Sequence, residues 1–108
     1  MWQTVLAGLI AEFGPALGKA AAALFQALIE KLLARISAKL SPPTGDARQD
    51  RLTLLDAAAA ATRPRQLLKR TALHRLRHAV AQGGTPQKAD VADAARLIQR
   101  AEADPAEK

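Results

Sequence analysis

The sequence contains no cysteine and no tyrosine, and aromatic residues make up only 3% of its 108 positions. The lack of cysteine excludes a disulfide framework and a thiolate metal site. The β-branched and aromatic residues that favour strands are too sparse to build a sheet. Apolar residues make up 49% of the chain and are mostly alanine and leucine, which are strong helix formers. We therefore predict an all-α fold.

Groups that carry catalysis are also scarce. The only serines, Ser37 and Ser41, lie in no nucleophile motif, and no glycine-rich phosphate loop is present. The carboxylates are scattered, so no acid–base pair stands out. His74 and His78 have the spacing of metal ligands on a helix, but arginines lie between them and the sequence has no third histidine. We predict a protein that is not an enzyme and uses no metal or cofactor.

The sequence shows no clear signal peptide and no clean membrane-spanning segment. Residues 1–11 are apolar, but no basic region precedes them and Glu12 follows directly. The longest mostly apolar stretch, residues 2–29, contains Glu12 and Lys19. Each charge would cost about 2.5–3.5 kcal/mol near the centre of a bilayer, which counts against insertion.

Large apolar residues recur at helical spacing through residues 1–40 and form a broad stripe. Gly14 and Pro15 interrupt this stripe, and a proline inside a helix removes one hydrogen bond, so we expect a break or kink there. The stripe nearly keeps its phase across the interruption. The pattern therefore predicts either one long kinked amphipathic helix or a pair of helices.

Three hypotheses remain open for residues 1–40: the core of a helical bundle, a self-associating rod, and a segment that inserts into a membrane. Small residues on one face would let helices approach closely. The residues assigned to helix packing and self-association are Ala7, Ala11, Gly14, Gly18, Ala21, Leu24, Leu28 and Leu32. The residues assigned to a membrane interface are Trp2, Phe13, Lys31, Arg35 and Lys39.

A Pro/Gly linker at residues 41–45 separates this rod from a compact three-helix part at residues 46–104. Asp46 and Gln49 form a capping-box pattern that starts the first of these helices. The predicted helices cover residues 47–62 and 64–82, and a third follows Thr85 and Pro86. Residues 105–108 are predicted to be a solvated tail.

The net charge of +6 equals that of the single segment 63–82, which has six basic residues and no acidic one. Such a helix suits an acidic partner, either nucleic acid or an anionic membrane, although charged helix faces are often only solvated. The absence of interleaved aromatics counts against base stacking. The residues assigned to binding phosphate or an anionic surface are Arg63, Arg65, Lys69, Arg70, Arg75 and Arg77.

These features favour a non-enzymatic structural or assembly component of a larger complex, which packs through its N-terminal helix and faces an acidic partner with its basic helix. We expect it to be a homo-oligomer or part of a larger protein assembly, with no small-molecule substrate. A minor bacteriophage virion protein fits the size and basicity, which places the chain in a virion or the bacterial cytoplasm. One alternative is a membrane-active or membrane-anchored protein that inserts residues 2–40 at the membrane periphery. A second alternative is a nonspecific DNA-binding accessory protein.

Overall fold

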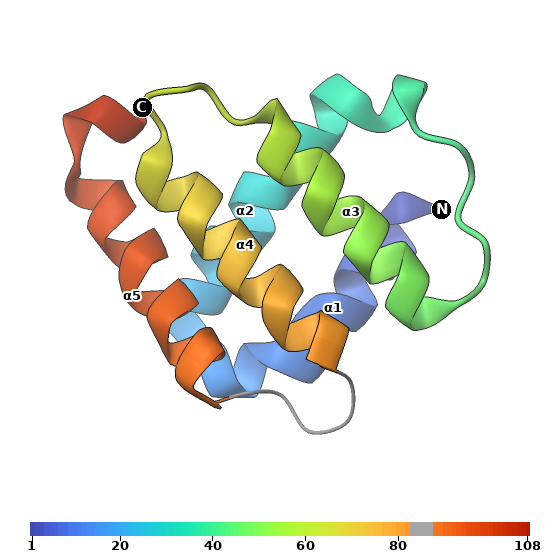
Figure 1. Ribbon diagram of the computed structural model, residues 1–108, viewed down its shortest axis with the longest axis horizontal. Coiled ribbons are helices and arrows are strands. Elements are labelled where there is room, and N and C mark those ends of the chain that lie inside the picture. Colours follow the sequence, from blue (N-terminus) through green and yellow to red (C-terminus); the bar gives the residue numbers. More distant parts are fainter. Residues whose placement is uncertain (83–87) are drawn as a thin grey trace.

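The computed structural model describes residues 1–82 and 88–108, and this part of the chain is helical with no strand (Figure 1). The α-helices are α1 (Trp2–Leu17), α2 (Lys19–Ile36), α3 (Ala47–Ala61), α4 (Leu67–Gln82) and α5 (Lys88–Ala103). Two short 3-10 helices, η1 (Ser37–Lys39) and η2 (Pro105–Glu107), complete the description. The prediction of an all-α fold is confirmed. The glycines and the Thr85–Pro86 start predicted between α4 and α5 lie outside the described residues.

The helices form two layers. In Figure 1, α1 and α2 lie behind α3, α4 and α5, and both helices of the rear layer contact α3 and α5. Helix α4 lies in the front layer, between α3 and α5. The chain therefore has an N-terminal helix pair and a three-helix C-terminal part, as the sequence predicts.

The N-terminal helix breaks at Gly18, three residues after the predicted position. Gly18 has a φ of 90°, a conformation that glycine adopts readily and other residues avoid. Pro15 remains inside α1. The proline removes the hydrogen bond that would reach the carbonyl of Ala11, and because Ala11 is exposed, water can bond to that carbonyl instead.

The apolar stripe of residues 1–40 forms the core of this same chain. Nine of its large members are almost fully buried: Trp2, Leu6, Leu9, Phe13, Leu17, Phe25, Ile29, Leu32 and Leu33 are each at most 6% exposed. They belong to one core cluster with apolar residues of the other helices, such as Leu54, Leu73 and Val91. Of the three hypotheses for this segment, the structure favours the bundle core.

Two buried carboxylates fasten the ends of the C-terminal part. Asp50, at the start of α3, accepts hydrogen bonds from the backbone amides of Thr44 and Gly45 in the linker, at 2.8 and 3.0 Å. The Asp46 side chain accepts from the Gln49 amide at 3.1 Å, as the capping pattern predicts. The Asp46 amide donates to the Thr44 hydroxyl rather than to Gln49.

The prediction of a solvated tail is wrong at Glu107, which is only 2% exposed. Its carboxylate accepts hydrogen bonds from the backbone amides of Leu68 and Lys69, at 3.1 and 2.9 Å. These amides lie in the first turn of α4, where helical donors have no partner within the helix. Helix α4 has no acidic residue of its own in the first turn, and the Glu107 carboxylate, 38 residues after Lys69 in the sequence, takes that place.

Candidate functional site: a basic groove

Five of the six predicted anion-binding residues contact other parts of the chain, and Arg70, Arg75 and Arg77 do so at α3 or α5. The guanidinium of Arg70 donates from Nε to the Thr62 hydroxyl at 3.0 Å, and from Nη2 to the carbonyls of Thr62 and Arg63 at 3.3 and 3.2 Å. These groups lie just after α3, where helical carbonyls lack partners. Arg70 is therefore a capping residue for α3, and much of its hydrogen-bonding capacity is used internally.

Arg75 and Arg77 face carboxylates of the neighbouring helices. Arg77 pairs with Asp56 of α3 at 2.5 Å, and Arg75 lies 3.9 Å from Asp90 of α5. His78 also contacts Asp90, at 2.6 Å, which gives this histidine a structural partner. These contacts are largely exposed and each contributes little to stability, but they lower the net positive charge of this end of α4.

Two other cations of the basic segment lie near two cations of α2. Arg63 and Lys69 line a depression together with Lys31 and Arg35, which the sequence assigns to a membrane interface. The depression has a volume of about 50 Å³, and Lys108 of the last segment also lines it. We call it, together with the adjoining hollow described next, the basic groove. Two sets of residues that the sequence assigns to different surfaces thus lie on one surface.

The adjoining hollow has a volume of about 220 Å³ and extends the groove between α2 and α5. Leu28, Lys31 and Lys69 line both parts, so the two hollows lie next to each other along α2. The other residues of this part are Leu24, Ala27, Ile98 and Glu102. The whole groove therefore has five basic side chains and one acidic side chain on its walls.

The last residues of the chain shape the basic end of the groove. The Glu107 carbonyl accepts hydrogen bonds from the Gln66 side chain at 2.7 Å and from Lys69 Nζ at 2.8 Å. Arg65 donates to the Lys108 carbonyl at 3.3 Å. In Figure 1 the C-terminal end accordingly lies beside the start of α4. Arg65 stands at the edge of the groove and holds the segment that carries Lys108.

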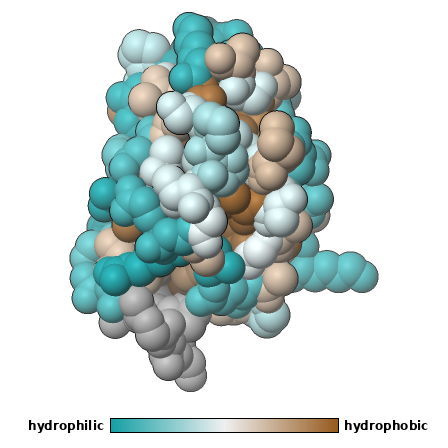
Figure 2. All heavy atoms as spheres, turned by 90° about the vertical axis from the view of Figure 1, so that its right-hand side faces the viewer, coloured by the Kyte–Doolittle hydropathy of each residue, from teal (hydrophilic) through white to brown (hydrophobic). Residues whose placement is uncertain are grey.

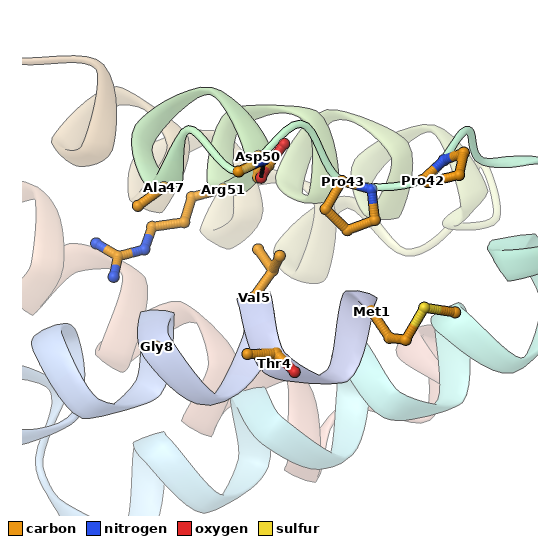
Figure 3. A pocket seen from close by; sticks show the side chains of 10 residues that line it. Met1, Thr4, Val5, Gly8, Pro42, Pro43, Ala47, Asp50 and Arg51 are labelled. Carbon is orange, nitrogen blue, oxygen red and sulfur yellow. Dashed lines mark hydrogen bonds between the residues drawn. The ribbon is translucent and has the colours of Figure 1, made fainter.

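A second hollow, of about 500 Å³, lies between α1, the linker and α3 (Figure 3). We call it the apolar hollow. Met1, Val5, Pro42 and Pro43 line it, and Figure 2 shows hydrophobic atoms at its base on the face toward the linker. Its charged side chains are already engaged, because Arg51 pairs with Glu12 and Asp50 binds the linker.

Hydrogen bonds set the acidity of Asp50. The backbone amide of Thr44 is the main cause that holds the pKa of this carboxyl below its usual value. The Thr44 hydroxyl, at 2.9 Å, and the Gly45 amide act in the same direction, while burial opposes them. Asp50 is therefore an anion that fastens the linker, rather than a group poised to exchange protons near neutral pH.

The residues predicted for self-association do not share one exposed face. Ala7, Ala11 and Gly18 are exposed, whereas Ala21 and Leu32 are buried. Gly14, Leu24 and Leu28 are half-buried, and both of these leucines line the basic groove. Self-association through the small residues stays a prediction, and the large residues that would accompany them contribute mainly to the core or the groove.

The residues predicted for a membrane interface are also divided. Trp2 is buried and donates from its indole to the Ser41 carbonyl at 3.1 Å, and Phe13 is 2% exposed. Lys31, Arg35 and Lys39 are exposed, but only Lys31 and Arg35 line the groove. In the described residues, every helix falls short of the length and apolar character needed to cross a bilayer.

Sequence reasoning missed the contributions of Gln66, Glu107 and Lys108 to the groove. Their involvement depends on how η2 folds back onto α4, and a short polar segment carries no periodic signal for such a contact.

Residues 1–82 and 88–108 contain no cluster of three or more metal-ligating side chains. No protein-family model, curated protein or solved structure matches this chain.

Proposed function

We propose that this chain is a small non-enzymatic binding component of a larger assembly, which holds an acidic partner in the basic groove. The observation that carries the proposal is the convergence of Lys31, Arg35, Arg63, Lys69 and Lys108 from separate segments, against the single acid Glu102. Like charges gathered along a concave surface raise the local potential and attract anions.

The distribution of charge elsewhere supports the same conclusion. Arg70, Arg75 and Arg77 are turned to carbonyls and carboxylates of the chain itself, so they are less available to a partner. Of the groove cations, Lys69 also donates to a carbonyl of the chain, that of Glu107. The groove keeps most of its cations without an opposing carboxylate on its walls. A minor virion component, with an acidic protein or nucleic acid as its neighbour, is a setting that would use such a surface.

Binding of labelled polyanions at low salt tests this function. Fluorescence anisotropy would compare a polyglutamate peptide and duplex DNA on wild-type protein and on the double variant Lys31→Gln/Arg35→Gln. We expect at least one polyanion to bind, and the variant to bind it about tenfold more weakly, since two charge contacts of roughly 0.7 kcal/mol each are lost.

The matched control is the double variant Lys19→Gln/Lys39→Gln, which loses the same charge at exposed positions outside the groove. Equal weakening in both variants would mean that only net charge matters and would contradict a groove site. Failure of wild-type protein to bind either polyanion at low salt would also contradict it.

A further inference from the structure

The lining of the basic groove changes from apolar to basic along α2. Its walls between α2 and α5 are mostly apolar and include Leu24, Ala27 and Leu28 from α2 and Ile98 from α5. Lys31 follows one turn later, and Arg35 stands at the basic end. With a rise of 1.5 Å per residue, the α2 wall from Leu24 to Arg35 is about 17 Å long, or about three helical turns.

The charges of the groove have a direction. Glu102 lines only the hollow between α2 and α5, whereas Arg35, Arg63 and Lys108 line only the other hollow, and Lys31 and Lys69 line both. An anion is repelled by Glu102 in the hollow between α2 and α5 and attracted toward the basic end. A complementary ligand therefore carries an apolar group first and negative charges about one to two turns later.

A nucleic acid backbone does not have this asymmetry, because it presents one phosphate at every step along each strand. Laid along the groove, it would bring phosphates against Leu24 and Leu28 and close to Glu102. A protein helix can instead place a leucine-sized side chain in the hollow of about 220 Å³ and carboxylates beside the cations. Helices bind in grooves through such spaced apolar anchors.

We propose that the basic groove binds an acidic amphipathic segment of a partner protein. An apolar side chain of that segment lies between α2 and α5 against Leu24, Ala27 and Leu28, and its carboxylates pair with Lys31, Arg35, Arg63 and Lys69. This inference rests on the proposed function and adds to it the chemical class of the partner and the direction in which it lies.

Ala27 offers a variant that separates apolar recognition from charge recognition. Ala27 is exposed and lines the apolar part, so Ala27→Lys obstructs the anchor site while adding a positive charge. Recognition by charge alone predicts equal or tighter binding of every polyanion, whereas an apolar anchor predicts weaker binding. Ala20→Lys is the matched control, since Ala20 is also exposed on α2 and does not line the groove.

The probes are two labelled glutamate-rich helical peptides of equal charge, one with a single leucine one turn before its acidic end and one with serine there. Duplex DNA is the third probe. We expect wild-type protein and Ala20→Lys to prefer the leucine peptide by about tenfold, the value of roughly 1.4 kcal/mol for a leucine that is partly buried. Ala27→Lys should lose this preference.

Two results would overturn the inference while leaving the proposed function intact. One is equal binding of the leucine and serine peptides to wild-type protein. The other is DNA binding that is tighter than that of either peptide and is preserved or strengthened in Ala27→Lys. If instead no probe responds to Lys31→Gln/Arg35→Gln, the proposed function itself fails and the inference fails with it.

Discussion

The apolar hollow and the basic groove differ in how the chain uses its own charges. In the apolar hollow, Asp50 is bonded to the linker and Arg51 to Glu12, so the charged groups serve the fold. In the basic groove, five cations share the walls with one acid. The balance of charges on the walls therefore distinguishes the two hollows. In the apolar hollow the charged side chains are paired within the chain, whereas the basic groove has an excess of cations that can bind an anion.

The same contrast exists within the basic segment 63–82. Arg70, in the first half of α4, caps α3, whereas Arg63, just before α4, lines the groove. Both arginines belong to one cluster in the sequence, yet Arg70 stabilises the fold while Arg63 lies on the proposed binding surface. A charge run therefore says how many cations are present but not how many are available.

The largest effect among the polar contacts of the two regions is expected for Glu107→Ala, on the groove side. The substitution leaves the Leu68 and Lys69 amides without their acceptor in a partly buried place. The free energy of unfolding should fall by about 1–3 kcal/mol. Urea denaturation would measure it, with the exposed Glu102→Ala as control. Equal stability of both variants would show that η2 does not fasten α4.

A smaller effect is expected for Asp50→Asn, on the side of the apolar hollow, because the linker residues Thr44 and Gly45 are exposed and water can replace the carboxylate. The pKa of Asp50 is lowered in the folded protein. Its contribution to stability is therefore present above about pH 4 and is lost as the pH falls through the folded-state pKa.

Thermal unfolding of wild-type protein and Asp50→Asn between neutral and acidic pH would check this sign. The two melting temperatures should differ near neutral pH and converge below pH 4 or so. A difference that stays constant, or grows on acidification, would contradict the assignment of a stabilising anion at Asp50.

The two arginines of the basic segment should respond differently to alanine. Arg70→Ala removes three hydrogen bonds to the end of α3, so stability should fall by about 1 kcal/mol while groove binding changes little. Arg63→Ala should change stability by less than about 0.5 kcal/mol and weaken polyanion binding. Denaturation and fluorescence anisotropy on both variants would show whether Arg70 serves stability and Arg63 serves binding. Equal changes of stability and of affinity in the two variants would contradict this difference.

The one gain in stability is expected for Gly8→Ala, in α1 beside the apolar hollow. A Cβ there would lie 3.2 Å from Nη2 of Arg51, the end of a flexible side chain that can shift by a few tenths of an ångström. Alanine favours a helix over glycine by about 1 kcal/mol, so we expect a net gain below that value. Polyanion binding should be unchanged. A loss of stability would show that the Arg51–Glu12 pair cannot yield.

Much of the fold could be predicted from the sequence. Alanine and leucine content predicted the helical class, the Asp46 cap located the start of α3, and the helix breaker predicted at residues 41–45 lies between η1 and α3. The break in the N-terminal helix was placed wrongly, because Pro15 is tolerated where the carbonyl that it leaves unpaired is exposed, whereas Gly18 adopts the positive φ. That choice depends on tertiary exposure, which periodicity does not report.

The candidate site could be predicted only in pieces. The sequence identified Arg63 and Lys69 as anion-binding residues and singled out Lys31 and Arg35 for another surface. Their proximity depends on how α2 packs against α3 and α5, which brings Lys31 and Arg35 near residues 63–69, about 30 positions later in the sequence. The partners of Arg70 and Arg77 were unpredictable for the same reason, since Thr62 and Asp56 lie on another helix or its end.

The most direct test of the central claim is a nuclear magnetic resonance titration of isotope-labelled protein with a polyglutamate peptide. The account predicts that the amide signals that move lie along the groove, around Lys31, Arg35, Arg63 and Lys69, while those of Val5 and Gly45 at the apolar hollow stay in place. Shifts concentrated at the apolar hollow, or spread evenly over all exposed cations, would contradict it.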